Sequence, residues 1–434
     1  MLSSVKNVFK VHDLRGKILF TLLMVVLYRA GAHIPVPGID YQQVKQLQDE
    51  AEQQGTIGFL NLFSGGALSQ FAIFALGIMP YITASIIVQI LGVVIPKLEE
   101  WQNQGAVGQR KITQWTRYLT IAIALLQATG LTFVFGRGGA NSVFFGQGAP
   151  NVVLLPGFPL PRVLLVIMTL TAGTVLLMWI GELMTEKGIG NGMSMLIFAS
   201  VVSSLPFQYY ALLKESQFVV FGFLVVLSLV TLVAIVCMEL AQRRIPVQFA
   251  KRVVGRRMYG GQSTYIPLKI NQAGVIAIIF ASSVLFLPAL LVQVVPWEPV
   301  QNFVNDYILD TTNWLHLLLY GVLIIGFSYF YNSIAFSPEK QADQLRKQGG
   351  FIPGIRPGPQ TERYLRKVLN RLTLPGAIFI AIIALLPSIV LAIGGVNRFP
   401  FGGTTVLIAV GVALELNKQI DSQLMMRNYE GFLK

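Results

Sequence analysis

The chain has 434 residues, of which 54% are hydrophobic and only 12% are charged, and its formal net charge at pH 7 is +13. Charged residues make up about a quarter of a soluble domain, so this composition excludes an ordinary soluble protein and predicts an integral membrane protein. The sequence contains no nucleotide-binding loop, zinc-protease motif or serine-hydrolase motif, and its three histidines lie far apart, so it offers no candidate catalytic centre.

Ten apolar stretches are predicted to span the membrane when the chain is examined in windows of about 19 residues. All but six of the 33 Lys and Arg residues fall in every second connection, and the positive-inside rule then puts both termini in the cytoplasm. An even number of spans agrees with this orientation. The predicted spans cover residues 18–34, 71–95, 119–135, 163–180, 193–207, 219–238, 273–294, 314–334, 372–393 and 403–414.

The first span also resembles a secretory signal peptide. It has a basic start, an apolar run and the small residues Ala30, Gly31 and Ala32 where a cleavage site would lie. We expect the span to be retained, because the charge pattern needs it for an even number of spans.

The second apolar region, residues 59–91, is too long for one span and is interrupted at Ser64, Gly65 and Gly66. The piece before the interruption is short, and even a helix of about ten residues would reach only about 15 Å of a hydrocarbon core of about 30 Å. A half-span beside a full span is tolerated where it is buried in protein or lines a water-filled cavity, so the pair indicates a pore or a substrate cavity. The alternative interpretation is an ordinary re-entrant or interfacial loop.

The interior of the predicted spans carries only mild polarity. No Asp, Glu, Lys or Arg falls near a predicted membrane midplane, which argues against an ion-coupled carrier. The simplest role for the remaining polar side chains is hydrogen bonding between helices, and the functional alternative is a seam weak enough to open. These side chains belong to Thr83, Ser85, Gln89, Gln127, Ser282 and Ser283.

Two long basic loops follow the sixth and eighth predicted spans. Alternation and the Gly260–Gly261 pair predict a hairpin in the first loop, and Gly and Pro residues in the second hold Arg356 at the apex of a rigid turn. Clustered arginines with aromatic neighbours bind RNA phosphates, an acidic protein face or anionic lipid heads, and the sequence does not separate these partners. The basic residues of the first loop are Arg243, Arg244, Lys251, Arg252, Arg256 and Arg257.

Several motifs together resemble one family. They are GIMPYITAS from Gly77, GIGNGMSMLIFASVVSSLP from Gly188, QSTYIPLKIN from Gln262, FIPGIRPGPQT from Phe351 and FGGTTVLIAVGVALE from Phe401. In their order along the whole chain they resemble the SecY family of protein-conducting channels, the central subunits of Sec protein translocases, and most closely its bacterial form.

This resemblance implies an all-α integral membrane protein with ten transmembrane helices in two inverted five-helix halves, residues 1–211 and 212–434, around an hourglass pore. The cytoplasmic loops would be residues 240–271 and 337–371. A ring of branched apolar side chains would form the constriction and exclude water and ions by dewetting. By motif position the ring falls on Ile78, Ile82, Ile197, Ile279 and Ile408.

The resemblance also implies a short plug helix and a lateral gate. The plug, at about residues 59–69, would comprise Phe59, Leu60, Asn61, Leu62, Phe63, Ser64, Gly65, Gly66, Ala67 and Leu68. The gate would open between the second and third spans and the seventh and eighth, which places Thr83, Ser85, Gln89, Gln127, Ser282, Ser283 and Leu287 along its seam. A bacterial member of the family has an aromatic residue at the position of Leu287, so the resemblance leaves the detail of the gate open.

The implied function is passive translocation of unfolded secretory polypeptides and sideways release of membrane-protein helices into lipid, with no cofactor and no enzymatic activity. The implied partners are the SecE and SecG subunits, the SecA ATPase motor, the ribosome, signal sequences and nascent chains, besides anionic lipids. Arg356 matches the apex arginine needed for productive motor action, and the location would be the bacterial inner membrane. Two alternatives from the residues are a secondary transporter for a small solute, and an insertase or scaffold without a continuous pore.

Overall fold

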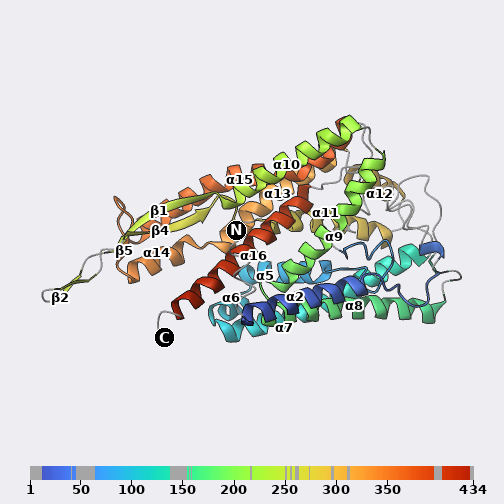
Figure 1. Cartoon of the computed structure of the whole chain (residues 1–434), viewed down its shortest axis with the longest axis horizontal. Coiled ribbons are helices and arrows are strands. Elements are labelled where there is room, and N and C mark those ends of the chain that lie inside the picture. Colours follow the sequence, from blue (N-terminus) through green and yellow to red (C-terminus); the bar gives the residue numbers. More distant parts are fainter. Residues whose placement is uncertain are drawn as a thin grey trace.

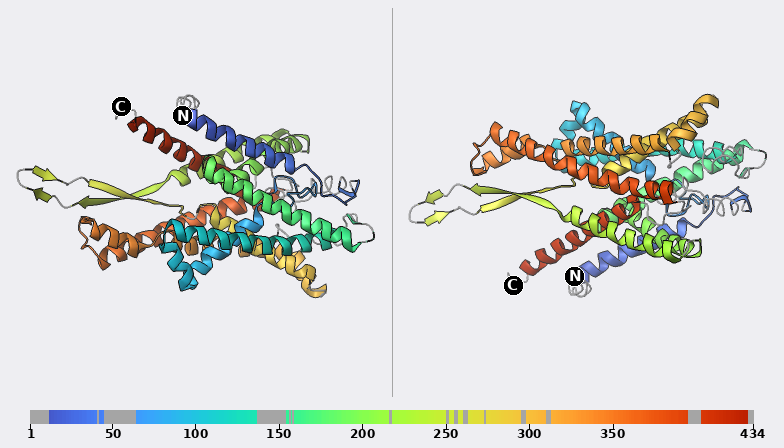
Figure 2. Two further views of the ribbon diagram at one scale, coloured as in Figure 1. Left: turned by 90° about the horizontal axis from the view of Figure 1, so that it is seen from below. Right: turned by 90° about the horizontal axis from the view of Figure 1, so that it is seen from above.

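The computed structural model describes residues 12–40, 42–44, 64–136, 154–155, 157, 159–215, 218–249, 252–254, 257–259, 263–272, 274–294, 298–309, 313–394 and 403–430. These residues form a mostly helical protein whose long helices run roughly along one common axis (Figure 1). A narrow β-hairpin projects from one end of the helices (Figure 2).

Proline and glycine mark the beginnings of some helices in the first half. Pro80 lies in the first turn of α5, where its missing N–H costs no helical hydrogen bond. Gly190, with φ of +82°, lies in the short connection between α8 and α9. The helices are α2 (His12–Gly31), α5 (Met79–Val94), α6 (Pro96–Asn103), α7 (Ala106–Gly136), α8 (Leu160–Lys187) and α9 (Gly192–Glu215).

The second half contains longer helices that extend beyond the apolar windows. Charged residues precede the apolar part of α15, and both lie on one continuous helix of 36 residues. The elements are α10 (Phe218–Leu240), α11 (Ile276–Val294), α12 (Glu298–Phe303), the π-helix η2 (Val304–Leu309), α13 (Trp314–Ala335), α14 (Pro338–Lys347), α15 (Pro359–Gly394) and α16 (Gly403–Glu430).

Each of the ten predicted spans overlaps one described helix. Four helical stretches within the described residues are long and apolar enough by themselves to cross a membrane, and a fifth is added if the bent pair α5 and α6 counts as one span. The four are Leu160–Lys187, Phe218–Leu240, Trp314–Lys347 and Pro359–Val390. A membrane protein with several spans is therefore shown, and the number ten remains a prediction.

The start of the second predicted span is wrong by eight residues. The prediction placed it at residue 71, whereas α5 begins at Met79 and residues 65–78 follow a series of turns and one isolated β-bridge. The reason is a backbone pairing with the residues that follow α2, because Ile73 N–H donates to the Ile34 carbonyl at 2.9 Å and Pro35 bridges Ala72. These backbone groups are satisfied outside a helix, so the helix starts later.

The two basic loops form one small β-structure, which the all-α prediction did not contain. Strand β1 (Gln242–Phe249) pairs with β4 (Ser263–Lys269), as the predicted hairpin required, and with β5 (Gly350–Phe351) from the other loop. Two further short strands, β2 (Arg252–Val254) and β3 (Arg257–Tyr259), pair with each other. The start of α2 and the end of α16 lie on the same side of the molecule as this hairpin (Figure 2).

The buried apolar residues form four separate clusters. One lies wholly among elements of the first half, and includes Phe71, Phe135 and Leu170. A second lies among α10, α11, α13, α15 and α16, and includes Ile235, Ile324 and Ile380. A third supports the β-structure, and the fourth, described below, joins the two halves.

Candidate functional site

The cluster that joins the two halves, called here the central cluster, contains all five isoleucines that the sequence comparison assigned to a ring. Ile78, Ile197, Ile279 and Ile408 are buried, and Ile82 is partly buried against them. They come from the start of α5 and from α5, α9, α11 and α16, so both halves contribute. The buried members of the cluster are Tyr28, Ala32, Ala67, Ala72, Phe74, Ile78, Met79, Leu177, Met178, Ile180, Met184, Met193, Leu196, Ile197, Val201, Ile279, Ile408 and Val412.

The central cluster carries the hydroxyls of Tyr28 and of the partly buried Tyr81, and no charged side chain is buried among the described residues. Aliphatic side chains make no directional bonds with one another, and a narrow aliphatic constriction excludes water and ions by dewetting. An interface of this kind seals in one state and separates without breaking hydrogen bonds or ion pairs. Its chemistry therefore suits a barrier that parts and closes.

The predicted gate residues lie on helices that pack together, because α11 contacts both α5 and α7. Their described polar groups bond within their own helices: Thr83 Oγ1 donates to the Met79 carbonyl at 2.9 Å, and Ser282 Oγ donates to that of Ile279 at 3.0 Å. Gln89 likewise donates to Ser85 Oγ at 3.3 Å. Among the described residues no hydrogen bond joins α5 or α7 to α11, so apolar packing holds this seam.

Three further gate residues have less definite surroundings. Ser283 Oγ is buried without a hydrogen-bond partner among the described residues, and Gln127 is half-buried on α7. Leu287 lies on α11, but its side chain is outside the described part of the structure.

The described part of the predicted plug begins at Ser64 and is buried from there to Leu68, apart from the half-buried Gly66. Ser64 is helical and residues 65–68 form turns: Leu68 N–H donates to Ser64 Oγ at 3.2 Å, and Gly65 and Gly66 have φ of +65° and +87°. The remaining plug residues, Phe59, Leu60, Asn61, Leu62 and Phe63, lie outside the described residues.

Three residues around Gly65 were missed by sequence reasoning. The Arg29 guanidinium Nη1 donates to the Gly65 carbonyl at 2.7 Å. Directly beside it, the buried hydroxyls of Tyr28 on α2 and Ser200 on α9 lie 2.5 Å apart. No local pattern could have indicated these contacts, because the residues are separated by 36 and 172 positions.

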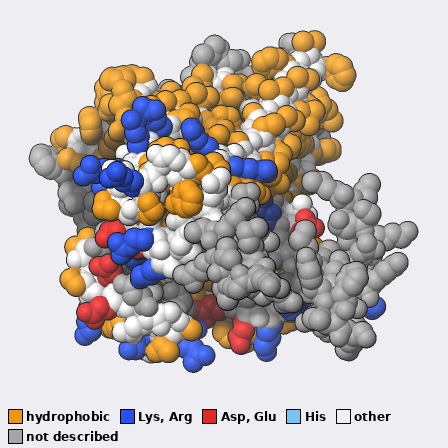
Figure 3. Space-filling view, turned by 90° about the vertical axis from the view of Figure 1, so that its left-hand side faces the viewer, with side chains coloured by type: hydrophobic (Ala, Val, Ile, Leu, Met, Phe, Trp, Pro, Cys, Tyr) orange, Lys and Arg blue, Asp and Glu red, His pale blue; other side chains and the backbone are white. Residues whose placement is uncertain are grey.

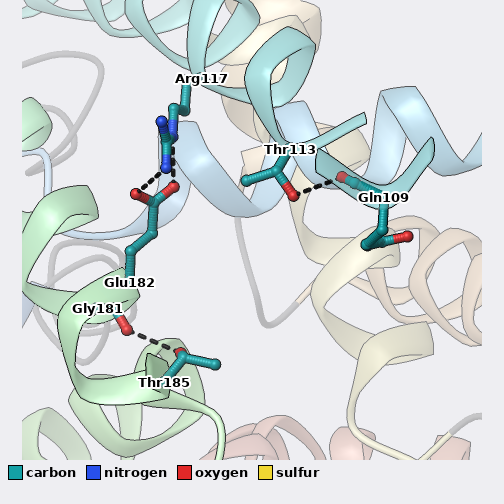
Figure 4. A network of polar contacts seen from close by, with 6 residues as sticks. All are labelled: Gln109, Thr113, Arg117, Gly181, Glu182 and Thr185. Carbon is teal, nitrogen blue, oxygen red and sulfur yellow. Dashed lines mark hydrogen bonds and ion pairs between the residues drawn. The ribbon is translucent and has the colours of Figure 1, made fainter. Parts of the chain in front are cut away.

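A polar clasp holds α7 to α8 (Figure 4). Arg117 Nε and Nη2 donate to the two carboxylate oxygens of Glu182 at 2.8 and 2.7 Å. One turn further along α8, Thr185 Oγ1 donates to the Gly181 carbonyl and accepts from Gly192 N–H, which also fixes the start of α9. An ion pair thus joins α7 to α8, and no ion pair joins α11 to α5 or α7 among the described residues.

The end of the molecule that carries the hairpin is rich in Lys and Arg (Figure 3). Arg356 is exposed in the predicted turn, where Gly354 and Gly358 have φ of +81° and +105°. Arg244 stacks on Tyr265, with its guanidinium carbon 4.9 Å from the ring centroid. The other exposed cations among the described residues of these loops are Arg243, Lys269, Lys340, Arg346, Lys347, Arg363, Arg366, Lys367 and Arg371.

Two further basic residues of the first loop, Arg252 and Arg257, are on the paired strands β2 and β3 toward the tip of the hairpin, and only their backbone is described. Lys251 and Arg256 lie outside the described residues.

Three comparisons bear on this arrangement. A family model described as SecY matches residues 72–417. The protein translocase subunit SecY of Streptomyces coelicolor is 50% identical over 446 residues, which cover 100% of both chains.

Solved channel structures share the fold. One, which concerns the plug domain of the SecY protein and the closed state of its translocation channel, has a TM-score of 0.61 at 19% identity and covers 94% of this chain and 91% of the other. Another, Sec61 in the canine ribosome-channel complex from the endoplasmic reticulum, has a TM-score of 0.56 at 16% identity with the same coverage.

Proposed function

The chain belongs to the SecY family of protein translocase subunits, and we propose how its described parts carry out protein translocation. Like its family, the chain is a protein-conducting channel and not an enzyme. The observation that carries the proposal is the central cluster, in which five isoleucines from both halves meet, while no charged side chain is buried anywhere among the described residues.

We assign the constriction of the pore to Ile78, Ile82, Ile197, Ile279 and Ile408. Four of these isoleucines are buried and Ile82 is partly buried. They come from α5 and the residue before it, and from α9, α11 and α16, so both halves contribute. Both features support this assignment. Because the isoleucines form only dispersion contacts with one another, they part around a polypeptide of any sequence and close again behind it.

The segment that begins at residue 59 and includes Ser64–Leu68 acts as the plug. Its described part is buried beside the central cluster, and Ala67 is a member of that cluster. Deletion of residues 61–68 should therefore raise the resting ion conductance of reconstituted channels, and an unchanged conductance would remove the plug assignment.

The lateral gate lies between α5 and α7 on one side and α11 and α13 on the other. The absence of described hydrogen bonds between α11 and either α5 or α7, together with the Arg117–Glu182 clasp within the first half, supports separation along this seam. A signal sequence is an apolar helix. When it inserts between these helices, its own apolar contacts replace those that the helices lose on separating.

The basic face made by the two loops receives the partner that supplies energy. Its exposed arginines and its single β-structure support docking of the SecA ATPase or the ribosome, with Arg356 at the apex of the second loop. SecE and SecG complete the channel, and anionic lipids contact the same basic face. With this basic face in the cytoplasm, both termini are cytoplasmic as well. The ten helices cross the bacterial inner membrane as two inverted halves.

Reconstitution tests this function. The chain is inserted with SecE and SecG into vesicles, and protection of a secretory polypeptide from added protease is measured with and without SecA and ATP. We expect protected polypeptide only when both are present. Accumulation of a small solute driven by an ion gradient, with no protected polypeptide, would overturn the proposal in favour of a carrier.

A further inference from the structure

We propose that Arg29 is a positioning residue for the plug: its guanidinium holds the Gly65 carbonyl and so keeps the plug segment in its closed position. This inference rests on the proposed plug function. Its evidence is a contact between the last turn of α2 and the first described turn of the plug segment, at 2.7 Å.

The contact is strong for its type because the donor is charged. Charge-assisted hydrogen bonds to backbone oxygens are shorter and stronger than neutral ones. Arg29 is also the basic residue of the last turn of α2, where the partial negative charge of the helix end favours a cation. The acceptor is a main-chain carbonyl, so the contact depends on the position of the plug backbone and not on a plug side chain.

The surroundings of Gly65 fit the contact closely. A Cβ atom at this position would lie 2.8 Å from the Tyr28 hydroxyl and 3.0 Å from Arg29 Nη1. Tyr28 is held by its own contact with Ser200, so its hydroxyl is fixed beside Gly65. The space beside Gly65 is therefore filled by the residues that hold it, and a side chain here would push them apart.

The other end of the segment is attached separately. Val36 N–H donates to the Phe71 carbonyl at 3.1 Å, and Pro35 bridges Ala72. Residues 66–70 thus lie between two attachments to the α2 region, one made by a side chain and one by backbone. Loss of the Arg29 contact releases the segment at Gly65, while the backbone pairing at residues 71–72 keeps its other end in place.

The test measures ion efflux from vesicles that contain the full chain with SecE and SecG, without SecA. We expect Arg29→Gln to raise the resting leak by about tenfold, because a hydrogen bond to a charged group shifts a two-state equilibrium by roughly that factor or more. Arg29→Lys should restore part of the seal. Arg162→Gln, at an exposed arginine near the start of α8, is the matched control and should leave the leak unchanged.

A glycine pair provides a second test that does not remove Arg29. Gly65→Ala and Gly66→Ala place a side chain at similar positive φ, but only Gly65 has neighbours within 4 Å of the new carbon. We expect a clearly larger leak for Gly65→Ala. Equal leaks for the two variants would overturn the proposal, because backbone strain alone would then explain both.

Combination with the deletion of residues 61–68 separates this inference from the plug assignment. In the deleted channel Arg29→Gln should add nothing, since its partner is gone. If the deletion leaks but Arg29→Gln in the full channel does not, the positioning role is wrong and the plug remains. If Arg29→Gln adds an equal leak in both backgrounds, its role is only structural and the proposal is overturned.

Discussion

Individual side chains at the centre of this channel act through shape and apolarity. Ile408 is only 3% exposed and Ile279 only 6%, although they come from different helices and meet residues of the opposite half. Each isoleucine considered alone would be assigned to an ordinary core or to a lipid-facing surface. Only their position in family motifs singled them out, and the structure then brings them into one cluster.

Ile408→Ala tests the packing of that cluster. Truncation of a buried isoleucine leaves a cavity, so we expect a loss of about 2 to 4 kcal/mol of stability together with a raised ion leak. Ile382→Ala is the matched control, because this side chain is 56% exposed, and its loss should be about 0.5 kcal/mol or less. Thermal unfolding of the purified complex in detergent measures the stability of both variants. Equal losses of stability would contradict a packed constriction at Ile408.

Arg356→Glu tests the apex of the second loop. The side chain is exposed and the turn is closed by backbone contacts such as Ile355 N–H to the Ile352 carbonyl at 3.0 Å, so the fold should survive the charge reversal. We expect loss of SecA-driven transport with an unchanged unfolding temperature. Arg162→Glu reverses an exposed arginine near the start of α8, outside the two loops, and should retain most transport. Normal transport by Arg356→Glu would remove the proposed role of this loop.

Among the elements, α8 packs closely against the turns that precede α5. Gly173 on α8 leaves room for the backbone of Ile73, since a Cβ here would lie 2.1 Å from the Ile73 carbonyl oxygen. Hydropathy predicted a helix from residue 71 because residues 71–78 are apolar. The pairing of residues 34–36 with 71–73 is a long-range contact that hydropathy does not contain.

Gly173→Ala tests this contact. A methyl group facing backbone forces α8 and the turns apart, so we expect a loss of about 1 to 3 kcal/mol. Gly222→Ala on α10 has nothing within 4 Å of the new carbon and should be neutral or stabilising by up to about 1 kcal/mol, because alanine favours helix more than glycine. The unfolding temperatures of the two variants are compared with that of the unaltered chain. A neutral Gly173→Ala would show that α8 and the turns before α5 separate easily.

The Arg117–Glu182 clasp between α7 and α8 makes a more modest contribution. The two side chains are 48% and 21% exposed, so solvent screens the pair despite its bidentate geometry. We expect Glu182→Gln to cost about 1 kcal/mol or less at low salt, and the cost to shrink at high salt. Unfolding temperatures at the two salt concentrations provide the measurement, and a large loss that salt does not change would contradict a screened surface pair.

Long apolar windows located the helices well, because hydrocarbon-length runs leave few alternatives to a spanning helix. Turn chemistry likewise located the hairpin and the turn around Arg356. What sequence reasoning could not foresee was the pairing of β1 with β5, since Phe249 and Gly350 are a hundred positions apart. The extension of α15 through charged residues was missed for a different reason, namely that hydropathy detects the membrane and not the end of a helix.

Taken as a whole, the molecule consists of two groups of helices with separate cores and one shared apolar interface. The first group has contacts such as the Arg117–Glu182 ion pair and the close approach of α8 to the turns before α5, and the second has contacts such as Asn332 Nδ2 to Thr373 Oγ1 at 2.8 Å. Between the groups lies the central cluster. This distribution of contacts favours motion of the two halves as units, with the isoleucines at the line of separation.

The path of the polypeptide tests this account most directly. A cysteine replaces Ile408 in a variant whose exposed Cys237 is also replaced, and SecE, SecA and a stalled secretory polypeptide with cysteines along its length are added. Disulfide crosslinks at position 408 should follow the stalled segment, because the polypeptide passes through the ring of isoleucines. No crosslink at 408, with strong crosslinks at exposed positions such as 382, would mean that the polypeptide passes elsewhere and that the central cluster is only a core.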